Sequence, residues 1–360
     1  MSTELKGLIL SGGKGTRLRP ITHTSAKQLV PVANKPVLFY GIEAMVDAGI
    51  KDIGIIIAPE TGDEIVEATG DGSRFGNGVK ITHILQDEPA GLAHAVLTAE
   101  DFIGDSPFVM YLGDNLLRNG ITDLTEAFKN NAPDALILLT PVPDPEHYGV
   151  AELTDGRVVQ LLEKPPEPKT DLALVGVYMF TTSIFDAARA IEPSPRGELE
   201  ITDAIQYLVD QGKNVEPHIV KGWWKDTGRL DDMLQANRLI LEDLEPRVEG
   251  ELIDSTVDGR VVIEAGARVE RSVIRGPAVI GSGARLIDSY IGPYTAIGEN
   301  VKVTGSEIEY SIVLADTEIE HLGARLEASL IGKGSRIRRT EGMPRTFRLM
   351  VGDSSEISLV

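Results

Sequence analysis

A glycine-rich run near the N-terminus carries the residue types that bind a polyphosphate. The run Leu10-Ser11-Gly12-Gly13-Lys14-Gly15-Thr16-Arg17-Leu18 directly follows an apolar segment. Glycines let a backbone bend closely around a ligand and turn N–H groups inward, and Lys14 and Arg17 add positive charge. The run is not a P-loop, because no Gly-Lys-Ser/Thr follows at the required spacing, and Leu18 occupies the third-glycine position of the dinucleotide fingerprint. By itself, the run is consistent with either an anion site or a structural turn.

Charge along the chain separates this region from the rest. The net charge is −20, a field that opposes nucleic acids and anionic membranes. Between Met1 and Ile42 the only acid is Glu4. The basic residues of the same stretch are Lys6, Lys14, Arg17, Arg19, Lys27 and Lys35. We therefore expect a local anion site, and neither a nucleic-acid partner nor a membrane partner.

Several classes of protein are excluded by composition. The chain has no cysteine, which excludes disulfides, thiolate zinc sites and cysteine nucleophiles. Its six histidines are scattered, with no pair at zinc-binding helical spacing. No apolar run reaches the roughly 18 residues of a membrane span, and residues 1–6 lack the regions of a secretory signal. We expect a cytoplasmic protein.

Apolar strands that alternate with helical stretches must position the glycine run. The predicted strands are residues 5–10, 52–57, 108–112 and 135–139, and a helix is predicted over 36–49. Near-continuous apolar strands separated by helices indicate a parallel sheet covered on both faces. Ligands of such sheets bind beyond the carboxyl ends of the strands. The loop at 11–17 and the Gly113-Asp114-Asn115 segment therefore belong to the same edge of the sheet.

The pattern changes after about residue 250, where apolar residues recur every five or six positions. These residues are Ile263, Val269, Ile274, Ile280, Leu286, Ile291, Ile297, Val303 and Ile308. A longer period of 17 overlies them, as in Ile280-Gly281-Ser282 and Ile297-Gly298-Glu299. Such a repeat indicates a triangular coil with apolar residues inside. It resembles the hexapeptide-repeat left-handed β-helix.

Further motifs give the chain a family resemblance over nearly its whole length. They are residues 25–36 (SAKQLVPVANKP), 86–93 (QDEPAGLA), 112–115 (LGDN), 148–150 (YGV), 163–165 (EKP), 174–178 (LVGVY), 196–203 (RGELEITD) and 224–228 (WKDTG). With the glycine run, these motifs resemble the sugar-1-phosphate nucleotidyltransferases, and most closely the long-form glucose-1-phosphate thymidylyltransferases. The resemblance implies an α/β fold, with a Rossmann-like nucleotidyltransferase domain over residues 1–245. A left-handed β-helix and C-terminal tail would follow over residues 246–360.

The resemblance also assigns roles to individual residues. Catalytic roles in binding phosphates fall to Arg17, Lys27, Lys164 and Arg196. The nucleotide would contact Leu10, Gly12, Gly13, Gly15, Thr16, Gln28, Gln86, Pro89 and Gly91. The sugar would contact Leu112, Gly149, Glu163, Val175 and Trp224. Asp114 and Asp226 would bind Mg²⁺, since each carboxylate supplies a hard oxygen ligand.

The implied reaction transfers a thymidylyl group from dTTP to glucose 1-phosphate. We also expect a homo-oligomer whose chains associate through the flat faces of the coil. UTP or another sugar phosphate is an open alternative, since thymine and uracil differ by one methyl group. A regulatory or scaffold relative is a second alternative, although the phosphate and metal positions are retained. A second, acyltransferase site on the coil is a third, and His321 is the only histidine after residue 218.

Overall fold

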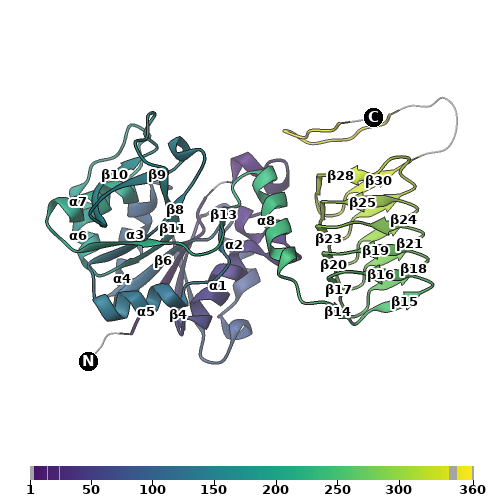
Figure 1. Cartoon of the computed structure of the whole chain (residues 1–360), viewed down its shortest axis with the longest axis horizontal. Helices are drawn as coiled ribbons and strands as arrows, with labels where there is room; N and C mark the ends of the chain where they lie inside the picture. Colours follow the sequence, from purple (N-terminus) through teal and green to yellow (C-terminus); the bar gives the residue numbers. More distant parts are fainter. Residues whose placement is uncertain (1–3, 14, 24, 340–346, 359–360) are drawn as a thin grey trace. The chain divides into compact units, whose positions relative to one another are not determined.

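The computed structural model describes residues 4–13, 15–23, 25–339 and 347–358 (Figure 1). These residues form two compact units. The first comprises Met1–Lys14 and Val37–Asp226, and the second comprises Gly15–Pro36 and Thr227–Val360. Each unit has a hydrophobic core of its own. In the described part of the chain, no helix is long and apolar enough to cross a membrane.

A nine-stranded sheet forms the centre of the first unit. Its parallel half has the order β6-β1-β4-β5. These strands are β1 (Lys6–Leu10), β4 (Asp52–Ile57), β5 (Lys80–Leu85) and β6 (Phe108–Leu112). The apolar side chains of β1 and β6 are almost entirely buried, as expected for strands covered on both faces. The strands predicted from the sequence are confirmed within one or two residues at their ends.

The other half of the sheet is mainly antiparallel and is built around β11 (Leu172–Phe180). β11 pairs antiparallel with β6, β8 and β9, β10 pairs antiparallel with β9, and β12 runs parallel to β8. These strands are β8 (Ala135–Pro141), β9 (Gly149–Thr154), β10 (Arg157–Glu163) and β12 (Val215–Ile219). No helix separates β9, β10 and β11, so short connections suffice there, as antiparallel pairing allows.

Helices flank this sheet, and a small strand pair lies outside it. The helices are α1 (Val37–Asp47), α2 (Gly62–Thr69), α3 (Leu92–Thr98), α4 (Glu100–Ile103), α5 (Thr122–Asn131), α6 (Ser183–Ala190) and α7 (Ile201–Asp210). The predicted glycine stop of α1 is confirmed, because Gly49 has a φ of 82° and its N–H bonds the carbonyl of Val46. The separate pair joins β7 (Asn115–Leu117) to β13 (Trp224–Asp226).

Three parallel sheets form the coil of the second unit, as in a left-handed β-helix (Figure 1). The first contains β14 (Arg247–Val248), β17 (Val261–Ile263), β20 (Ala278–Ile280), β23 (Thr295–Ile297), β26 (Ile312–Val313) and β29 (Leu330–Ile331). The second contains β15 (Glu251–Ile253), β18 (Arg268–Glu270), β21 (Arg285–Ile287), β24 (Lys302–Thr304), β27 (Glu318–Glu320) and β30 (Arg336–Arg338). The third contains β16 (Thr256–Asp258), β19 (Val273–Arg275), β22 (Tyr290–Ile291), β25 (Glu307–Glu309) and β28 (Leu326–Glu327).

The repeat of 17 is the register of this coil. Val269 pairs with Leu286, and Leu286 pairs with Val303, each one turn further along the chain. All nine apolar residues that the sequence placed inside the coil are fully buried. At one corner a stack of serines links successive turns: the Ser255 hydroxyl accepts a bond from the Ser272 N–H at 3.1 Å. Ser272 in turn accepts from the Ser289 N–H at 3.0 Å.

Besides the coil and the tail residues 347–358, the second unit contains a helix and a short hairpin segment. The helix is α8 (Leu230–Glu242), which precedes the coil. Segment Gly15–Pro36 holds three 3₁₀ turns (Thr16–Leu18, Ile21–His23 and Lys27–Leu29) and a hairpin of β2 (Pro31–Val32) and β3 (Lys35–Pro36). This segment carries several of the predicted phosphate-binding residues, so its anchoring bears on function.

Candidate active site

The carboxyl edge of the parallel strands collects the first predicted site segments. The Gly113 N–H donates to the Leu10 carbonyl at 3.0 Å, so the ends of β1 and β6 are bonded to each other. The Ser11 N–H donates to Ile56, and the Gln86 N–H donates to Ile57, at the end of β4. The predicted common edge is thus confirmed for Ser11, at the start of the glycine run, and for the Gly113-Asp114-Asn115 segment, and Gln86 joins it.

Gln86 is a buried amide fixed beside the start of the glycine run. Its Nε2 lies 2.8 Å from Nδ1 of His94, which orients the amide. Its Oε1 would lie 3.3 Å from a Cβ added to Gly12. Gly12 therefore leaves room for the Gln86 amide. This arrangement suits the predicted contact of Gln86 with a nucleotide base. Pro89 lies in the loop that follows, before α3.

Gly91 occupies a place where two backbones meet. Its φ is 108°, and a Cβ there would lie 2.4 Å from the Leu199 carbonyl oxygen. The Leu199 N–H donates to Ala90, and the Ala93 N–H donates to Leu199. Close backbone packing therefore requires a glycine at position 91, independently of the base contact that the motif implies. The same bonds tie the loop of Gln86 to the segment that carries Arg196.

The strand pair β7–β13 brings the backbone of Asp226 close to that of Asp114, the two residues predicted to bind the metal ion. Asp226 is paired with Asn115, the residue next to Asp114. The Asn115 Nδ2 donates to Oδ1 of Asp114 at 3.1 Å. Two carboxylates offer the hard oxygen ligands that Mg²⁺ prefers, with substrate phosphates and water completing its shell. Among the described residues there is no cluster of three or more metal-binding side chains.

Asn115, which the sequence analysis did not single out, is a buried junction of this site. Its Oδ1 accepts from the Trp224 Nε1–H at 2.6 Å and from the Gly176 N–H at 3.2 Å. The backbone carbonyl of Asn115 accepts a hydrogen bond from the Tyr111 hydroxyl at 3.2 Å. Burial, and then the charge of Asp114, raises the pKa of Tyr111, which keeps this hydroxyl a donor. The sequence feature that could have identified Asn115 is its position directly after the predicted metal-binding residue Asp114.

The predicted sugar contacts lie on β6, β9, β10, β11 and β13. Gly149 at the start of β9 is paired with Glu163 at the end of β10. A Cβ on Gly149 would lie 3.1 Å from Oε2 of Glu163, so the glycine leaves that carboxylate uncovered. Trp224 packs edge-on against Tyr148, with ring centroids 5.5 Å apart. Leu112 ends β6, and Val175 is fully buried in β11.

Glu163 is also the meeting point of two predicted phosphate-binding cations. Its Oε1 lies 3.0 Å from Nη2 of Arg196 and 3.3 Å from Nζ of Lys164. The Thr202 hydroxyl donates to its Oε2 at 3.2 Å. The structure thus brings Arg196 to the adjacent residues Glu163 and Lys164, which lie about 30 positions earlier in the chain. Thr202 is a further member that sequence reasoning missed.

The carboxylate of Glu200 holds the guanidinium of Arg196 in place. It is only 3% exposed and accepts from Arg196 Nη2 at 2.8 Å and from the Ser194 hydroxyl at 2.7 Å. Partial burial lowers the pKa of Arg196, but the hydrogen bond to Glu200 and the neighbouring carboxylates raise it by more. The net shift of the pKa is upward, so the guanidinium stays charged. Burial, followed by the charges of Glu200 and Glu163, raises the pKa of Asp203. The cluster is therefore crowded with negative charge around one firmly held cation.

The remaining predicted nucleotide-binding and catalytic residues belong to the second unit. They are Gly15, Thr16, Arg17, Lys27 and Gln28. Gly15 has a φ of 60°, and a Cβ on it would lie 2.9 Å from Cβ of Lys27, so the glycine lets these two parts of the segment meet. Gln28 is buried, and its Oε1 has no hydrogen-bond partner among the described residues. Lys14 lies outside the described residues, which resume at Gly15. Gly13 is the last described residue before it.

Comparison with known proteins defines the class of this chain. The family model described as "Nucleotidyl transferase" matches residues 6–243. The chain belongs to this nucleotidyl transferase family, whose members transfer a nucleotidyl group and generally use a divalent metal ion. The matched region includes every predicted site residue.

Individual relatives make the likeness more specific. The chain is 56% identical to a glucose-1-phosphate thymidylyltransferase of Streptomyces antibioticus and 53% identical to one of Streptomyces griseus. Each comparison covers 99% of both chains. A solved structure from Bacillus anthracis, assigned as a glucose-1-phosphate thymidylyltransferase, is 37% identical with a TM-score of 0.62. That match covers 65% of this chain and 94% of the other.

Proposed function

We propose that this chain transfers a thymidylyl group from dTTP to α-D-glucose 1-phosphate and releases pyrophosphate, giving dTDP-glucose. The observation that carries the proposal is the strand pair that sets Asp226 beside Asp114, at the edge of a nucleotidyl transferase sheet. The full-length relatives of that activity support the choice of base and sugar. The cluster of Lys164 and Arg196 at Glu163 supplies cations for a sugar phosphate.

The chemistry requires two polyanions to be held together in line. A phosphate oxygen of the sugar phosphate is already an anionic nucleophile, so no general base is required for its attack on the α-phosphorus. Pyrophosphate leaves from the opposite side, and Arg17 and Lys27 offset its charge. Asp114 and Asp226 would hold Mg²⁺, which supplies charge stabilisation at the phosphates when bound. The contribution of the protein is mainly positioning and electrostatics.

The acceptor cluster explains how the sugar phosphate is oriented. Arg196 bonds both Glu163 and the buried Glu200. An incoming phosphate competes with Glu163 for the guanidinium, while Glu200 holds the same guanidinium through Nε and Nη2. Glu163 is then available to accept bonds from sugar hydroxyls beside Gly149. Lys164 adds a second positive charge for the phosphate.

Three finer statements belong to the same proposal. The catalytic sequence module spans residues 1–245, and the coil module spans 246–360. The protein acts in the cytoplasm, where nucleoside triphosphates and sugar phosphates are available. It forms a homo-oligomer through flat faces of its coil, which present long parallel sheets.

A direct test compares nucleotides in one assay of pyrophosphate release. Purified protein, Mg²⁺ and glucose 1-phosphate are mixed with dTTP or UTP, each with and without a chelator. We expect release with dTTP that the chelator abolishes. A hydrophobic pocket distinguishes one methyl group by about 10–200-fold in kcat/KM, so the preference over UTP should fall in that range.

The same assay distinguishes the alternatives. Faster release with UTP would replace the thymidylyl assignment with a uridylyl one. Absence of release with either nucleotide, over a panel of sugar 1-phosphates, would instead indicate a regulatory or scaffold protein. Galactose 1-phosphate and an amino-sugar phosphate complete the panel.

A further inference from the structure

Residues from two distant parts of the chain share the second unit. Segment Gly15–Pro36 lies in the same unit as α8 and the coil. The segment carries Arg17, Lys27 and Gln28, which the proposed function assigns to the nucleotide. What fixes this segment on the coil therefore bears on how the nucleotide is bound.

Asn34 ties the hairpin of this segment directly to the coil. Its Nδ2 donates to the carbonyl of Ile297 in β23 at 2.7 Å. Asn34 has a φ of 63° and Ala33 a φ of 48°, as a two-residue hairpin turn between β2 and β3 requires. Asparagine tolerates this left-handed conformation, so one residue both forms the turn and anchors it.

Asn237 of α8 makes a second, fully buried link. Its Oδ1 accepts from the Ala33 N–H at 2.9 Å, and its Nδ2 donates to the Tyr294 carbonyl at 2.9 Å. One side-chain amide thus bonds the hairpin on one side and the coil on the other. Both of these amide atoms are used, and a buried amide with its partners satisfied fixes geometry.

Apolar contacts accompany these two amides. Ala33 packs against a cluster formed by Leu241 of α8 with Val262, Val279 and Ala296 of the coil. Closer to Arg17 along the chain, Ile21 Cδ1 would lie 3.3 Å from a Cβ added to Gly332. The segment is therefore seated on the coil at two separate places, on either side of Lys27 and Gln28.

We infer that the β-helix positions the nucleotide-binding segment, and that Asn34 and Asn237 are the positioning residues that fix this segment on the coil. The inference rests on the proposed function, because it concerns the same nucleotide site. A fixed segment presents Arg17 and Lys27 without an ordering cost at each binding event, and preorganised charges act most strongly on a leaving group. The coil then contributes to catalysis within one chain, besides any part in assembly.

The variant Asn34→Gly tests this link most cleanly. Glycine keeps the left-handed turn and removes only the side-chain bond to Ile297. A second variant, Asn34→Asp, keeps the shape and replaces the donating Nδ2 with an oxygen. The matched control is Asn300→Gly: Asn300 is also left-handed, with a φ of 55°, and its amide lies 3.3 Å from Oδ1 of Asp316 within the coil.

The informative measurement separates the two substrates. In both Asn34 variants we expect KM for dTTP in the forward reaction, and for pyrophosphate in the reverse reaction, to rise about three- to tenfold. KM for glucose 1-phosphate should stay unchanged, because Glu163, Lys164 and Arg196 belong to the other unit. A merely structural role would lower the active fraction, and hence kcat, without this split.

Hydrogen exchange and equilibrium binding provide readouts that do not require turnover. Peptides covering residues 15–30 should exchange faster in Asn34→Gly than in the wild type or in Asn300→Gly, and dTTP should bind more weakly. Equal exchange and equal KM for dTTP in Asn34→Gly and Asn300→Gly would overturn the inference. If the wild type shows no turnover, the proposed function fails, and exchange with dTTP binding still decides whether the coil fixes the segment.

Discussion

Asn115 joins three parts of the candidate site through one buried side-chain amide. It donates to Asp114 and accepts from Trp224 and Gly176, so the predicted metal-binding carboxylate and the predicted sugar-contacting indole depend on the same group. The family motifs identified Asp114 and Trp224. Asn115, Thr202 and Glu200 were not identified, because their roles lie in contacts with residues distant in sequence.

The Asn115→Ala variant should therefore damage both stability and activity. It leaves the Trp224 and Gly176 N–H groups without their acceptor, and an unsatisfied buried donor costs about 1–3 kcal/mol. We expect the free energy of unfolding, measured with denaturant, to fall by about that much. Turnover should fall by more than the loss of folded protein explains.

Asn119→Ala is the matched control for this prediction. Asn119 lies two residues beyond β7, is exposed, and donates to the Lys221 carbonyl at 2.9 Å. Its truncation should change neither stability nor turnover appreciably. Equal effects of the two variants would contradict the role given to Asn115.

At the scale of elements, sequence patterns predicted what is local and periodic. The repeat of 17 gave the register of the coil, and apolar runs gave β1, β4 and β6. The antiparallel half of the sheet could not be predicted as well. β9, β10 and β11 are joined without helices, and the sequence of a single strand does not determine which strand it pairs with. The pairing of β7 with β13 joins residues over 100 positions apart, and no local sequence pattern predicts this pairing.

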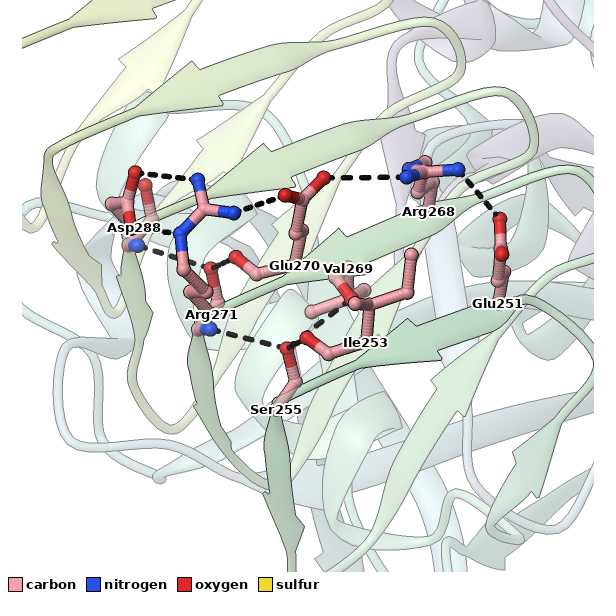
Figure 2. A network of polar contacts seen from close by, with 10 residues as sticks. Glu251, Ile253, Ser255, Arg268, Val269, Glu270, Arg271 and Asp288 are labelled. Atoms are coloured by element: carbon pink, nitrogen blue, oxygen red, sulfur yellow. Dashed lines mark hydrogen bonds and ion pairs between the residues drawn. The ribbon is translucent and has the colours of Figure 1, made fainter.

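The coil should owe its stability to its apolar interior and little to its charged surface. Ile291 is fully buried in β22, and Ile291→Ala should cost about 2–5 kcal/mol of unfolding free energy. Arg271 makes a paired contact with Asp288 at 2.8 and 2.9 Å on the exposed corner (Figure 2). Exposed ion pairs are screened by water and salt.

Arg271→Ala is accordingly the comparison variant for the coil. Denaturant unfolding of both proteins should show a large shift for Ile291→Ala and almost none for Arg271→Ala. A larger loss of stability in Arg271→Ala would mean that the surface network, and not the apolar interior, holds the turns together.

At the scale of the whole molecule, charge and chain connectivity matter most. The proposed reaction requires a chain of net charge −20 to bind two polyanions. The cations proposed to bind them are those of the basic N-terminal region together with Lys164 and Arg196. The glycine run begins in the first unit and continues into the second, where Arg17 and Lys27 lie. Sequence patterns predicted the sheet and the coil, but the seating of residues 15–36 on the coil depends on side-chain bonds such as those of Asn34 and Asn237.

The transfer of isotope from nucleotide to sugar tests the central claim most directly. Purified protein, Mg²⁺ and glucose 1-phosphate are incubated with dTTP carrying ³²P at its α-phosphate, and the products are separated. We predict that the label appears in dTDP-glucose and none in pyrophosphate. Arg17→Ala and Asp114→Ala, both folded, should slow this transfer by about 10²–10³-fold, as expected when one electrostatic group is removed. Absence of labelled sugar nucleotide with the wild type, or near-normal transfer in either variant, would contradict the account.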